Sequence, residues 1–387
     1  MHPPLPGRTF ALCAARALAG IGFAAAAAFC AAQAPAASDA APVPTPVPVT
    51  EPAATKPPAD ASAAPAAAAG AIVALVLPLD AADYARAAEA VRAGFLAAAE
   101  AAGAKSDVVV IAHGDDDVLS AFDKARAAGA RVIVGPLVRD HLKIVAASDA
   151  PLPWTIALNQ LDEGATLPPR VYTLALAIES DARVIARRAR DDGVMTIGVI
   201  GGDTPLMKRF ATAFAGEWLL VGGDAPLMFR FDATPDGLTA LRRNLARVKL
   251  DAVVIAAEGP DAALVKSFIP RLTAYASAQI NQRQTAANLR DLDDVRLVDL
   301  PWLITPEAPE FANIPRREFP SAALDRLYAL GLDAYRVARV FAAGAPDRLD
   351  LEGATGHVTL IEGRQLAREG RLGVFKSGRI VPLDAVR

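Results

Sequence analysis

From Ile72 onward, short apolar runs alternate with longer stretches in which apolar positions recur at helical spacing. The first run, Ile72–Leu79, is mostly aliphatic and uncharged, which is typical of a strand buried on both faces of a parallel sheet. Pro78 ends it, because proline has no N–H to donate to a sheet ladder. A helical pattern follows from about Ala82 to Ala102, with Gly103 as its stop signal. The opening therefore predicts a strand, a loop at 78–84 and a helix, and parallel sheets bind ligands at such loops.

The same plan repeats until a crossing strand at Val171–Leu174 and then restarts. The predicted elements before the crossing are strands Val108–Ile111, Arg131–Val134 and Trp154–Leu158, and helices Val118–Ala128 and Asp140–Ala147. Those after it are strands Thr196–Ile200, Pro226–Phe231 and Ala252–Ala256, and helices Ser180–Asp191, Lys208–Leu219, Gly237–Val248 and Pro260–Arg271. This alternation predicts right-handed βαβ units. Because one parallel sheet holding all these strands would be unusual, we predict two lobes.

The last third of the chain departs from the repeat. The polar stretch Thr273–Asp294 is predicted to be a loop, and Val295–Val298 a strand. Apolar residues at helical spacing predict a long helix at Ala322–Ala342. Gly356–Ile361 and Leu372–Phe375 are predicted to form a terminal hairpin, which returns the chain to the first lobe.

The predicted fold class is therefore α/β, with two doubly wound parallel-sheet lobes joined by a hinge. Residues 71–175 and about 301–387 are assigned to the first lobe, and residues 176–300 to the second.

The first 34 residues are predicted to be an export signal. Arg8 and Arg16 form a positive region, and Ala17–Phe29 is an apolar stretch too short to span a bilayer. A cleavage site is expected at 32–34. Cys30 is the alternative, as the lipidated cysteine of a bacterial lipoprotein, although Phe29 precedes it where such signals have a small residue.

Residues 35–70 are rich in Ala, Pro, Thr and Ser, and they bury too little surface to fold. An extended linker of this kind reaches on the order of 100 Å, at about 3.1 Å per residue. It is interpreted as a passive spacer between a surface and the folded part.

Composition excludes some function classes. The formal net charge is −3 and no long basic run occurs, which argues against nucleic acid as the main partner. The chain has 2 cysteines, Cys13 and Cys30, and both fall within the leader, so the folded part has no disulfide and no cysteine metal site.

Three stretches of the chain have a distinctive wording: 289–304 (LRDLDDVRLVDLPWLI), 326–338 (RLYALGLDAYRVA) and 353–360 (GATGHVTL). They resemble the LppC family, the penicillin-binding-protein activators, and Ile72–Leu79 and 134–137 (VGPL) resemble the family's opening strands. The resemblance covers roughly residues 72–375. It implies a type I periplasmic-binding-protein fold and an outer-membrane lipoprotein that stimulates a bifunctional peptidoglycan synthase by direct contact. Longer members carry an N-terminal helical-repeat domain, where this sequence has the linker.

No motif requires an enzyme or a cofactor. None of His2, His113, His141 and His357 has a partner at metal-ligand spacing. The glycines at 198–202 (GVIGG) are interpreted as a tight turn, with a phosphate cradle as the alternative. The acidic run at 115–117 is interpreted as a solvated helix cap, with a cation site as the alternative. Trp302 and Tyr328 are interpreted as buried core residues, with residues that contact a partner as the alternative.

A ligand site is hypothesised at the facing edges of the two lobes. Amino-acid receptors of this fold hold the ligand carboxylate with hydroxyls and backbone N–H groups of the first lobe and the ammonium with an acid of the second. The corresponding turns here, at 135–137 and 159–160, offer no hydroxyl. The candidate ligand-binding residues are Asp80, Tyr84, Gly135, Asn159, Thr173 and Glu258.

Two functions follow from these observations. The first is a non-enzymatic regulator of peptidoglycan synthesis that contacts a penicillin-binding protein in the periplasm, tethered to the outer membrane if Cys30 is lipidated. The alternative is a periplasmic solute-binding protein that delivers an amino acid or another small polar ligand to an ABC importer.

Overall fold

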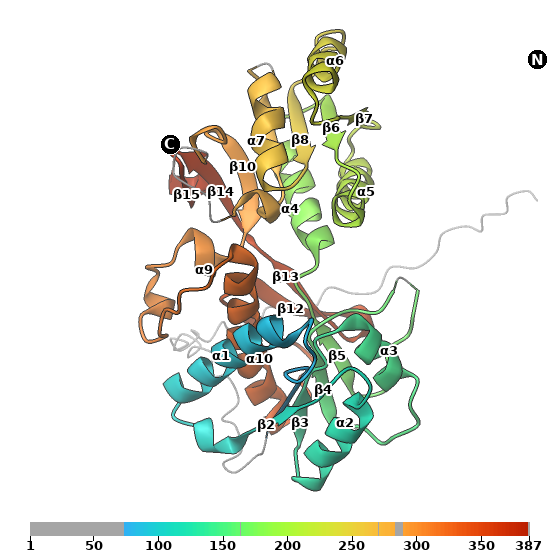
Figure 1. Cartoon of the computed structure of the whole chain (residues 1–387), viewed down its shortest axis with the longest axis vertical. Helices are drawn as coiled ribbons and strands as arrows, with labels where there is room; N and C mark the ends of the chain where they lie inside the picture. Colours follow the sequence, from blue (N-terminus) through green and yellow to red (C-terminus); the bar gives the residue numbers. More distant parts are fainter. Residues whose placement is uncertain (1–72, 163, 270, 283–288, 386–387) are drawn as a thin grey trace, which may run out of the picture. The chain divides into compact units, whose positions relative to one another are not determined.

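The computed structural model describes residues 73–162, 164–269, 271–282 and 289–385 (Figure 1). The predicted leader, the predicted linker and Cys30 lie outside these residues. Two mixed, mostly parallel sheets carry the fold, which confirms the predicted α/β class. Among the described residues, no helix combines the length and the apolar character needed to cross a membrane.

The first sheet has the strand order β11-β12-β13-β5-β4-β3-β1-β2. Its strands are β1 (Val73–Leu77), β2 (Val108–Ala112), β3 (Val132–Val134), β4 (Trp154–Ala157), β5 (Val171–Leu174), β11 (Asp350–Glu352), β12 (His357–Ile361) and β13 (Gln365–Glu369). Its helices are α1 (Ala85–Ala101), α2 (Val118–Ala127), α3 (Arg139–Ala146) and α10 (Ala322–Ala343). Pairing is parallel from β13 to β2 and antiparallel from β11 to β13.

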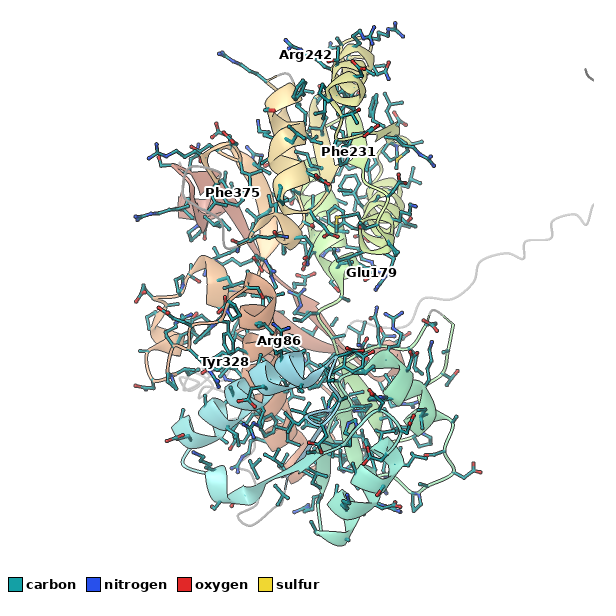
Figure 2. The ribbon with its side chains drawn as sticks, in the orientation of Figure 1. Arg86, Glu179, Phe231, Arg242, Tyr328 and Phe375 are labelled. Carbon is teal, nitrogen blue, oxygen red and sulfur yellow. The ribbon has the colours of Figure 1, made fainter. Side chains whose placement is uncertain are left out.

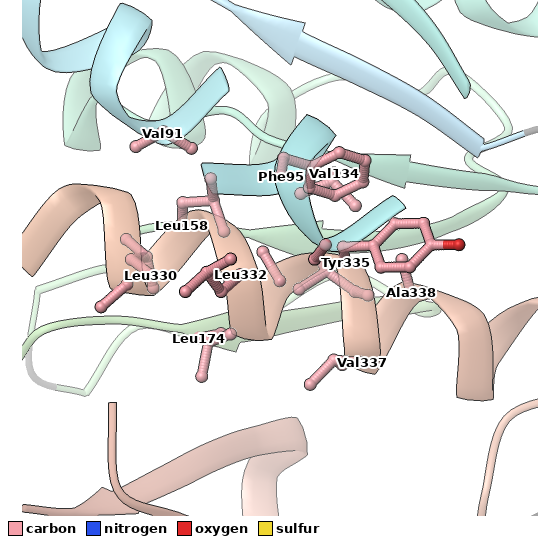
Figure 3. Close-up of a cluster of buried hydrophobic side chains, with 14 of the residues drawn as sticks. Val91, Phe95, Val134, Leu158, Leu174, Leu330, Leu332, Tyr335, Val337 and Ala338 are labelled. Carbon is pink, nitrogen blue, oxygen red and sulfur yellow. The ribbon is translucent and has the colours of Figure 1, made fainter. Parts of the chain in front are cut away.

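Alternate residues of β1 face two different helical layers, as expected for a strand buried on both faces. Val73, Leu75 and Leu77 pack in the core formed with α1 and α10. Ala74 and Val76 pack on the other face, with α2 and α3. Figure 3 shows how the first of these cores fills the space between α1, α10 and the sheet.

The second sheet has the strand order β15-β14-β10-β9-β8-β6-β7. Its strands are β6 (Ile197–Gly201), β7 (Leu227–Arg230), β8 (Ala252–Ala256), β9 (Thr273–Ala276), β10 (Val295–Asp299), β14 (Arg371–Lys376) and β15 (Arg379–Pro382). Helices α4 (Ile178–Asp191) and α5 (Pro205–Leu220) contribute to the core on one face. Helices α6 (Pro235–Leu245) and α7 (Gly259–Phe268) contribute to the core on the other.

The chain passes between the sheets three times, after β5, after β10 and between β13 and β14. The second passage runs through the short helix α9 (Pro301–Ile304) into α10. The third is a single residue, Gly370, at which a Cβ would lie 2.7 Å from Val298 Cγ1. The two sheets are therefore joined by short connections rather than by a linker.

Two predictions about single elements are wrong. The predicted loop at Thr273–Asp294 begins with a strand, β9, which lies between β8 and β10 because Tyr275 and its neighbours are buried there. Residues 283–288 of that loop lie outside the described residues.

The predicted terminal hairpin does not form either. Strand β12 pairs with β13, whereas β14 pairs with β10 and β15. Residues 371–382 therefore belong to the second sheet, although the sequence assigned all residues from about 301 to 387 to the first lobe. Apolar alternation predicts a strand, but it does not specify the partner strand.

Candidate functional site

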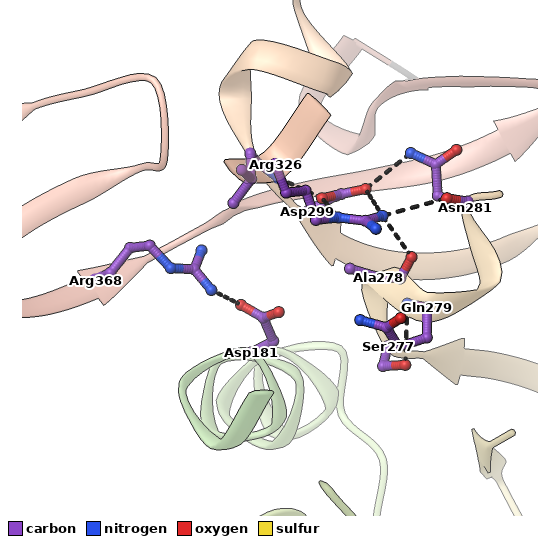
Figure 4. A network of polar contacts seen from close by, with 9 residues as sticks. Asp181, Ser277, Ala278, Gln279, Asn281, Asp299, Arg326 and Arg368 are labelled. Carbon is purple, nitrogen blue, oxygen red and sulfur yellow. Dashed lines mark hydrogen bonds and ion pairs between the residues drawn. The ribbon is translucent and has the colours of Figure 1, made fainter. Parts of the chain in front are cut away.

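The resembling stretches meet where the chain passes between the sheets (Figure 4). Asp299 ends β10, and its side chain is fully buried. Arg326 of α10 binds both of its carboxylate oxygens, Nε to Oδ1 at 2.9 Å and an Nη to Oδ2 at 2.7 Å. Asn281 Nδ2 donates to Oδ2 at 2.8 Å, and Arg326 also donates to the carbonyl of Ala278 at 2.7 Å. Burial lowers the pKa of Arg326, but the adjacent Asp299 outweighs it and the net shift is upward.

A second buried ion pair joins the sheets at the third passage. Arg368 of β13 donates to Asp181 Oδ1 of α4 at 2.7 Å, and the two side chains are 2% and 7% exposed. Burial raises the pKa of Asp181, against the attraction of Arg368. Arg368 also donates to the carbonyl of Thr355 at 3.0 Å. This arginine therefore connects three segments that are far apart in the sequence.

The turn at 353–356 is held by one carboxylate of α10. Asp333 accepts hydrogen bonds from the backbone N–H groups of Ala354 and Thr355, at 2.8 and 2.6 Å, and from the Thr355 hydroxyl at 2.6 Å. Burial raises the pKa of Asp333. The Asp333 of 326–338 and the GATG of 353–356 are therefore partners in one structural motif.

Trp302 and Tyr328 are core residues, as the sequence analysis favoured. Their rings lie 5.5 Å apart between centroids, and each residue is nearly fully buried. Burial raises the pKa of Tyr328 to about 12, and its hydroxyl donates to the carbonyl of Pro315 at 2.7 Å. The guanidinium of Arg316 stacks 3.4 Å from the Trp302 ring centroid. These aromatic residues stabilise the passage from β10 to α10.

The predicted ligand-binding residues of the first lobe lie along the ends of β1, β3 and β4. Asp80 is exposed, and Tyr84 is 37% exposed, with its ring centroid 6.2 Å from that of His141 and the two ring planes at 74°. Gly135 has φ +122°, and a Cβ there would lie 2.1 Å from the Val76 carbonyl oxygen. Asn159 donates from Nδ2 to the Leu137 carbonyl and accepts from the Gln160 N–H, both at 2.9 Å.

The remaining two candidates lie apart from these. Glu258 follows β8 and is the N-cap residue of α7, and its carboxylate accepts a hydrogen bond from the Thr204 hydroxyl at 3.2 Å. Thr173 of β5 is 5% exposed and lines a cavity of about 670 Å³. Of the six predicted residues, it alone contributes to that cavity, and the role of the six in ligand binding stays a prediction.

Most residues that line the cavity were not predicted from the sequence. They come from the β4–β5 connection, the start of α4, one face of α5 and strand β13. No local motif marks them, because they are brought together only by the packing of β13 against β5 and of α5 against α4.

Comparison with known proteins gives the family. The profile described as "LppC putative lipoprotein" matches residues 50–238 and 236–378. The chain therefore belongs to the LppC family, as its resembling stretches indicated.

Curated relatives bear the name "Penicillin-binding protein activator LpoA". The one from Pasteurella multocida is 27% identical over 321 residues, which are 81% of this chain and 55% of the relative. The one from Haemophilus influenzae is 24% identical over 270 residues, which are 67% of this chain and 46% of the relative. This chain thus spans about half the length of the curated relatives it matches.

Solved structures of two descriptions share the fold. A structure titled a "putative branched-chain amino acid ABC transporter" from Chromobacterium violaceum has a TM-score of 0.70 and 32% identity, over 79% of this chain and 100% of that chain. The LpoA C-domain from Haemophilus influenzae, titled a regulator of PBP1A, has a TM-score of 0.69 and 22% identity, over 81% and 100%. The second likeness, at this identity, shows the fold alone.

Proposed function

We propose that this protein is a non-enzymatic regulator of peptidoglycan synthesis that acts by direct contact with a penicillin-binding protein. The observation that carries the proposal is the LppC family match, which extends across both sheets. The curated relatives named as penicillin-binding protein activators support the kind of partner.

The geometry of the predicted ligand edge supports contact rather than amino-acid capture. Both polar atoms of the Asn159 side chain are already engaged by backbone groups of this chain. Gly135 presents no side chain, and Pro136 has no N–H to donate. A ligand carboxylate would therefore find no side-chain hydroxyl in the turns at 135–137 and 159–160, and no N–H at Pro136.

A binding experiment tests the proposal. The folded part, carrying a tag, is incubated with the periplasmic region of a bifunctional penicillin-binding protein from the same cell, and association is measured by biolayer interferometry. We expect saturable binding that persists when the transpeptidase site is blocked with penicillin. Absence of binding to every bifunctional synthase of that cell would count against the proposal.

The second candidate function is solute binding for an ABC importer. It is favoured by the 32% identity to the structure titled as a branched-chain amino acid transporter. Thermal unfolding with and without leucine, isoleucine, valine and other amino acids distinguishes the two functions. A true ligand at about 100 times its Kd adds about 2.7 kcal/mol of stability, so a receptor would show a clear rise in its unfolding temperature.

For location, we propose the periplasm, with tethering to the outer membrane through a lipid on Cys30. The support is the export signal in the sequence and a family described as lipoproteins. Mass spectrometry of the mature N-terminus decides between two outcomes. An acylated Cys30 supports the anchor, and a free N-terminus at Pro35 shows release after Ala34.

A further inference from the structure

The cavity of about 670 Å³ lies where elements of the two sheets face each other. On the side of the first sheet it is lined by Thr173 and by residues 160–162, 164, 165 and 167 of the connection between β4 and β5. On the side of the second sheet it is lined by residues at the start of α4 and on α5, and β13 forms its base. Its volume lies in the range typical of small-ligand sites in proteins.

Among the described residues, cationic side chains dominate the lining. They are Arg139, Arg183, Lys208, Arg209 and Arg368, against two described carboxylates, Asp162 and Glu179. Both lining carboxylates are already in ion pairs with lining arginines, Asp162 with Arg139 at 3.0 Å and Glu179 with Arg209 at 2.7 Å. The charge of Arg368 is neutralised by its buried ion pair with Asp181, which does not itself line the cavity.

Two cations are left without a buried counter-ion. Within the described part of the chain, Arg183 of α4 has neither an ion pair nor a side-chain hydrogen bond. It is exposed and lines the cavity. Lys208 of α5 has only Asp203, at 3.4 Å, and both of those side chains are largely exposed. An exposed pair of this kind contributes little, so Lys208 is available to another anion.

Neutral hydrogen-bonding groups surround these two cations. The hydroxyls of Thr173, Ser180 and Thr212 and the amides of Gln160 and Gln365 line the cavity, and no side-chain hydrogen bond occupies them among the described residues. The cavity thus combines uncompensated positive charge with free hydroxyl and amide groups.

The N-terminus of α4 also lies at the cavity, and the two acidic residues of its first turn, Glu179 and Asp181, are held in ion pairs by Arg209 and Arg368. Ala177, at its N-cap, offers no side-chain acceptor, and Ser180 and Arg183 lie one turn apart on the helix side that lines the cavity. The N–H groups of a first helical turn favour negative charge. Figure 2 shows Glu179 at this end of α4, facing the first sheet.

We infer that this cavity binds a small, polar, hydroxylated anion, through Arg183 and Lys208 from the second sheet's helices and Thr173 and Gln160 from the first sheet. A zwitterionic amino acid is disfavoured, because its ammonium would need a carboxylate and both lining carboxylates are held by arginines. This proposal is independent of synthase contact, and of the six ligand-binding residues predicted from the sequence it uses only Thr173.

Isothermal titration calorimetry on the folded part tests the inference with matched probes. Glucose 6-phosphate and glucuronate supply a phosphate and a carboxylate on a hydroxylated ring, inorganic phosphate supplies the charge alone, and glucose is the neutral parent. We expect binding of at least one sugar anion, weaker binding of inorganic phosphate and none of glucose. Affinity is expected to fall as salt rises, because the contact is ionic.

Variants assign the binding to this cavity. Arg183→Gln combined with Lys208→Gln should lower the affinity for the sugar anion by at least about tenfold. Arg242→Gln makes the same type of charge change at an exposed residue of α6 that does not line the cavity and lies far from the lining residue Glu179 in Figure 2, so it should leave affinity unchanged. Unfolding curves establish that the variants are folded. Failure of all three anions to bind, or equal binding by the double variant, would overturn the inference.

Discussion

Arg368 of β13 and Asp181 of α4 form an ion pair at 2.7 Å that is almost completely shielded from water, although 187 positions separate them in the sequence. With Arg326 and Asp299, they give the passages between the sheets two buried ion pairs. Removing one partner of such a pair leaves an uncompensated buried charge, whereas replacing both can be nearly neutral. The relationship therefore makes a specific prediction about single and double variants.

Arg368→Leu alone should lower the free energy of unfolding by about 3–5 kcal/mol, because Asp181 would lose its counter-charge. Arg368→Leu combined with Asp181→Leu should cost less than the sum of the two single changes. Urea unfolding of the four proteins measures this coupling. Simple additivity would show that the pair does not join the sheets energetically.

Removing the hydrogen bond between Thr355 and Asp333 should lower the free energy of unfolding by less than Arg368→Leu does. Thr355→Val keeps the shape of the side chain but removes the hydroxyl that donates to Asp333 Oδ2 at 2.6 Å. The free energy of unfolding should fall by about 1–3 kcal/mol, since a buried charged acceptor loses one donor. Thr239→Val is the control, because its hydroxyl bonds a carbonyl on the exposed surface of α6. Equal effects for the two variants would contradict this reading.

Packing of α1 against α10 depends on small residues at the contact. A Cβ at Gly331 would lie 2.1 Å from the Val91 carbonyl oxygen, and one at Gly94 would lie 1.9 Å from the Tyr328 carbonyl oxygen. Gly331→Ala should therefore destabilise the protein by about 1–3 kcal/mol, the usual cost of overpacking.

Gly216→Ala is the matched control for Gly331→Ala. It also lies within a helix, α5, but a Cβ there meets nothing within 4 Å, so the better helix propensity of alanine should be neutral or slightly stabilising. Thermal unfolding compares the two, and a stable Gly331→Ala protein would show that the helices can separate without cost.

Acid pH should destabilise the first lobe through His113. This side chain is fully buried, and burial lowers its pKa, while His141, with its ring centroid 5.1 Å away, lowers it further. Asp115, Asp117 and the Gly114 carbonyl act in the opposite direction.

The direction in which stability changes with pH follows from proton uptake by the unfolded chain. The unfolded chain takes up a proton near pH 6.5 before the folded chain does, so stability is full above that pH and declines as pH falls toward the folded pKa. Unfolding free energies between pH 8 and pH 5 should decline less for His113→Gln than for the native protein. Identical slopes would rule out His113 as the source.

The alternation of strands and helices was predictable from the sequence because the central strands β1, β3, β5 and β8 are buried throughout and the helices between them carry one apolar side. For two helices, the sequence contains a signal for the first residue that the predicted starts at Lys208 and Gly237 did not use. Thr204-Pro205 and Thr234-Pro235 combine an N-cap threonine with proline at the first helical position, and α5 and α6 begin there.

Pairing partners and the cavity were not predictable in the same way. Strand β9 is short and enters a polar stretch, so its burial depends on its neighbours β8 and β10 and not on its own pattern. Likewise, Arg183 and Lys208 are ordinary surface residues in the sequence, and only the packing of α4 on α5 places both at one cavity. The family-like stretches were informative because they hold one of the two buried ion pairs between the sheets, Asp299 with Arg326.

The decisive measurement is glycan polymerisation by a bifunctional penicillin-binding protein, followed with a labelled lipid-linked disaccharide precursor in the presence and absence of this folded protein. We expect the polymerisation rate or the coupled cross-linking to rise saturably with added protein, and the Arg183→Gln/Lys208→Gln variant to produce the same rise. Unchanged rates at saturating protein, with every bifunctional synthase of the cell, would contradict this expectation.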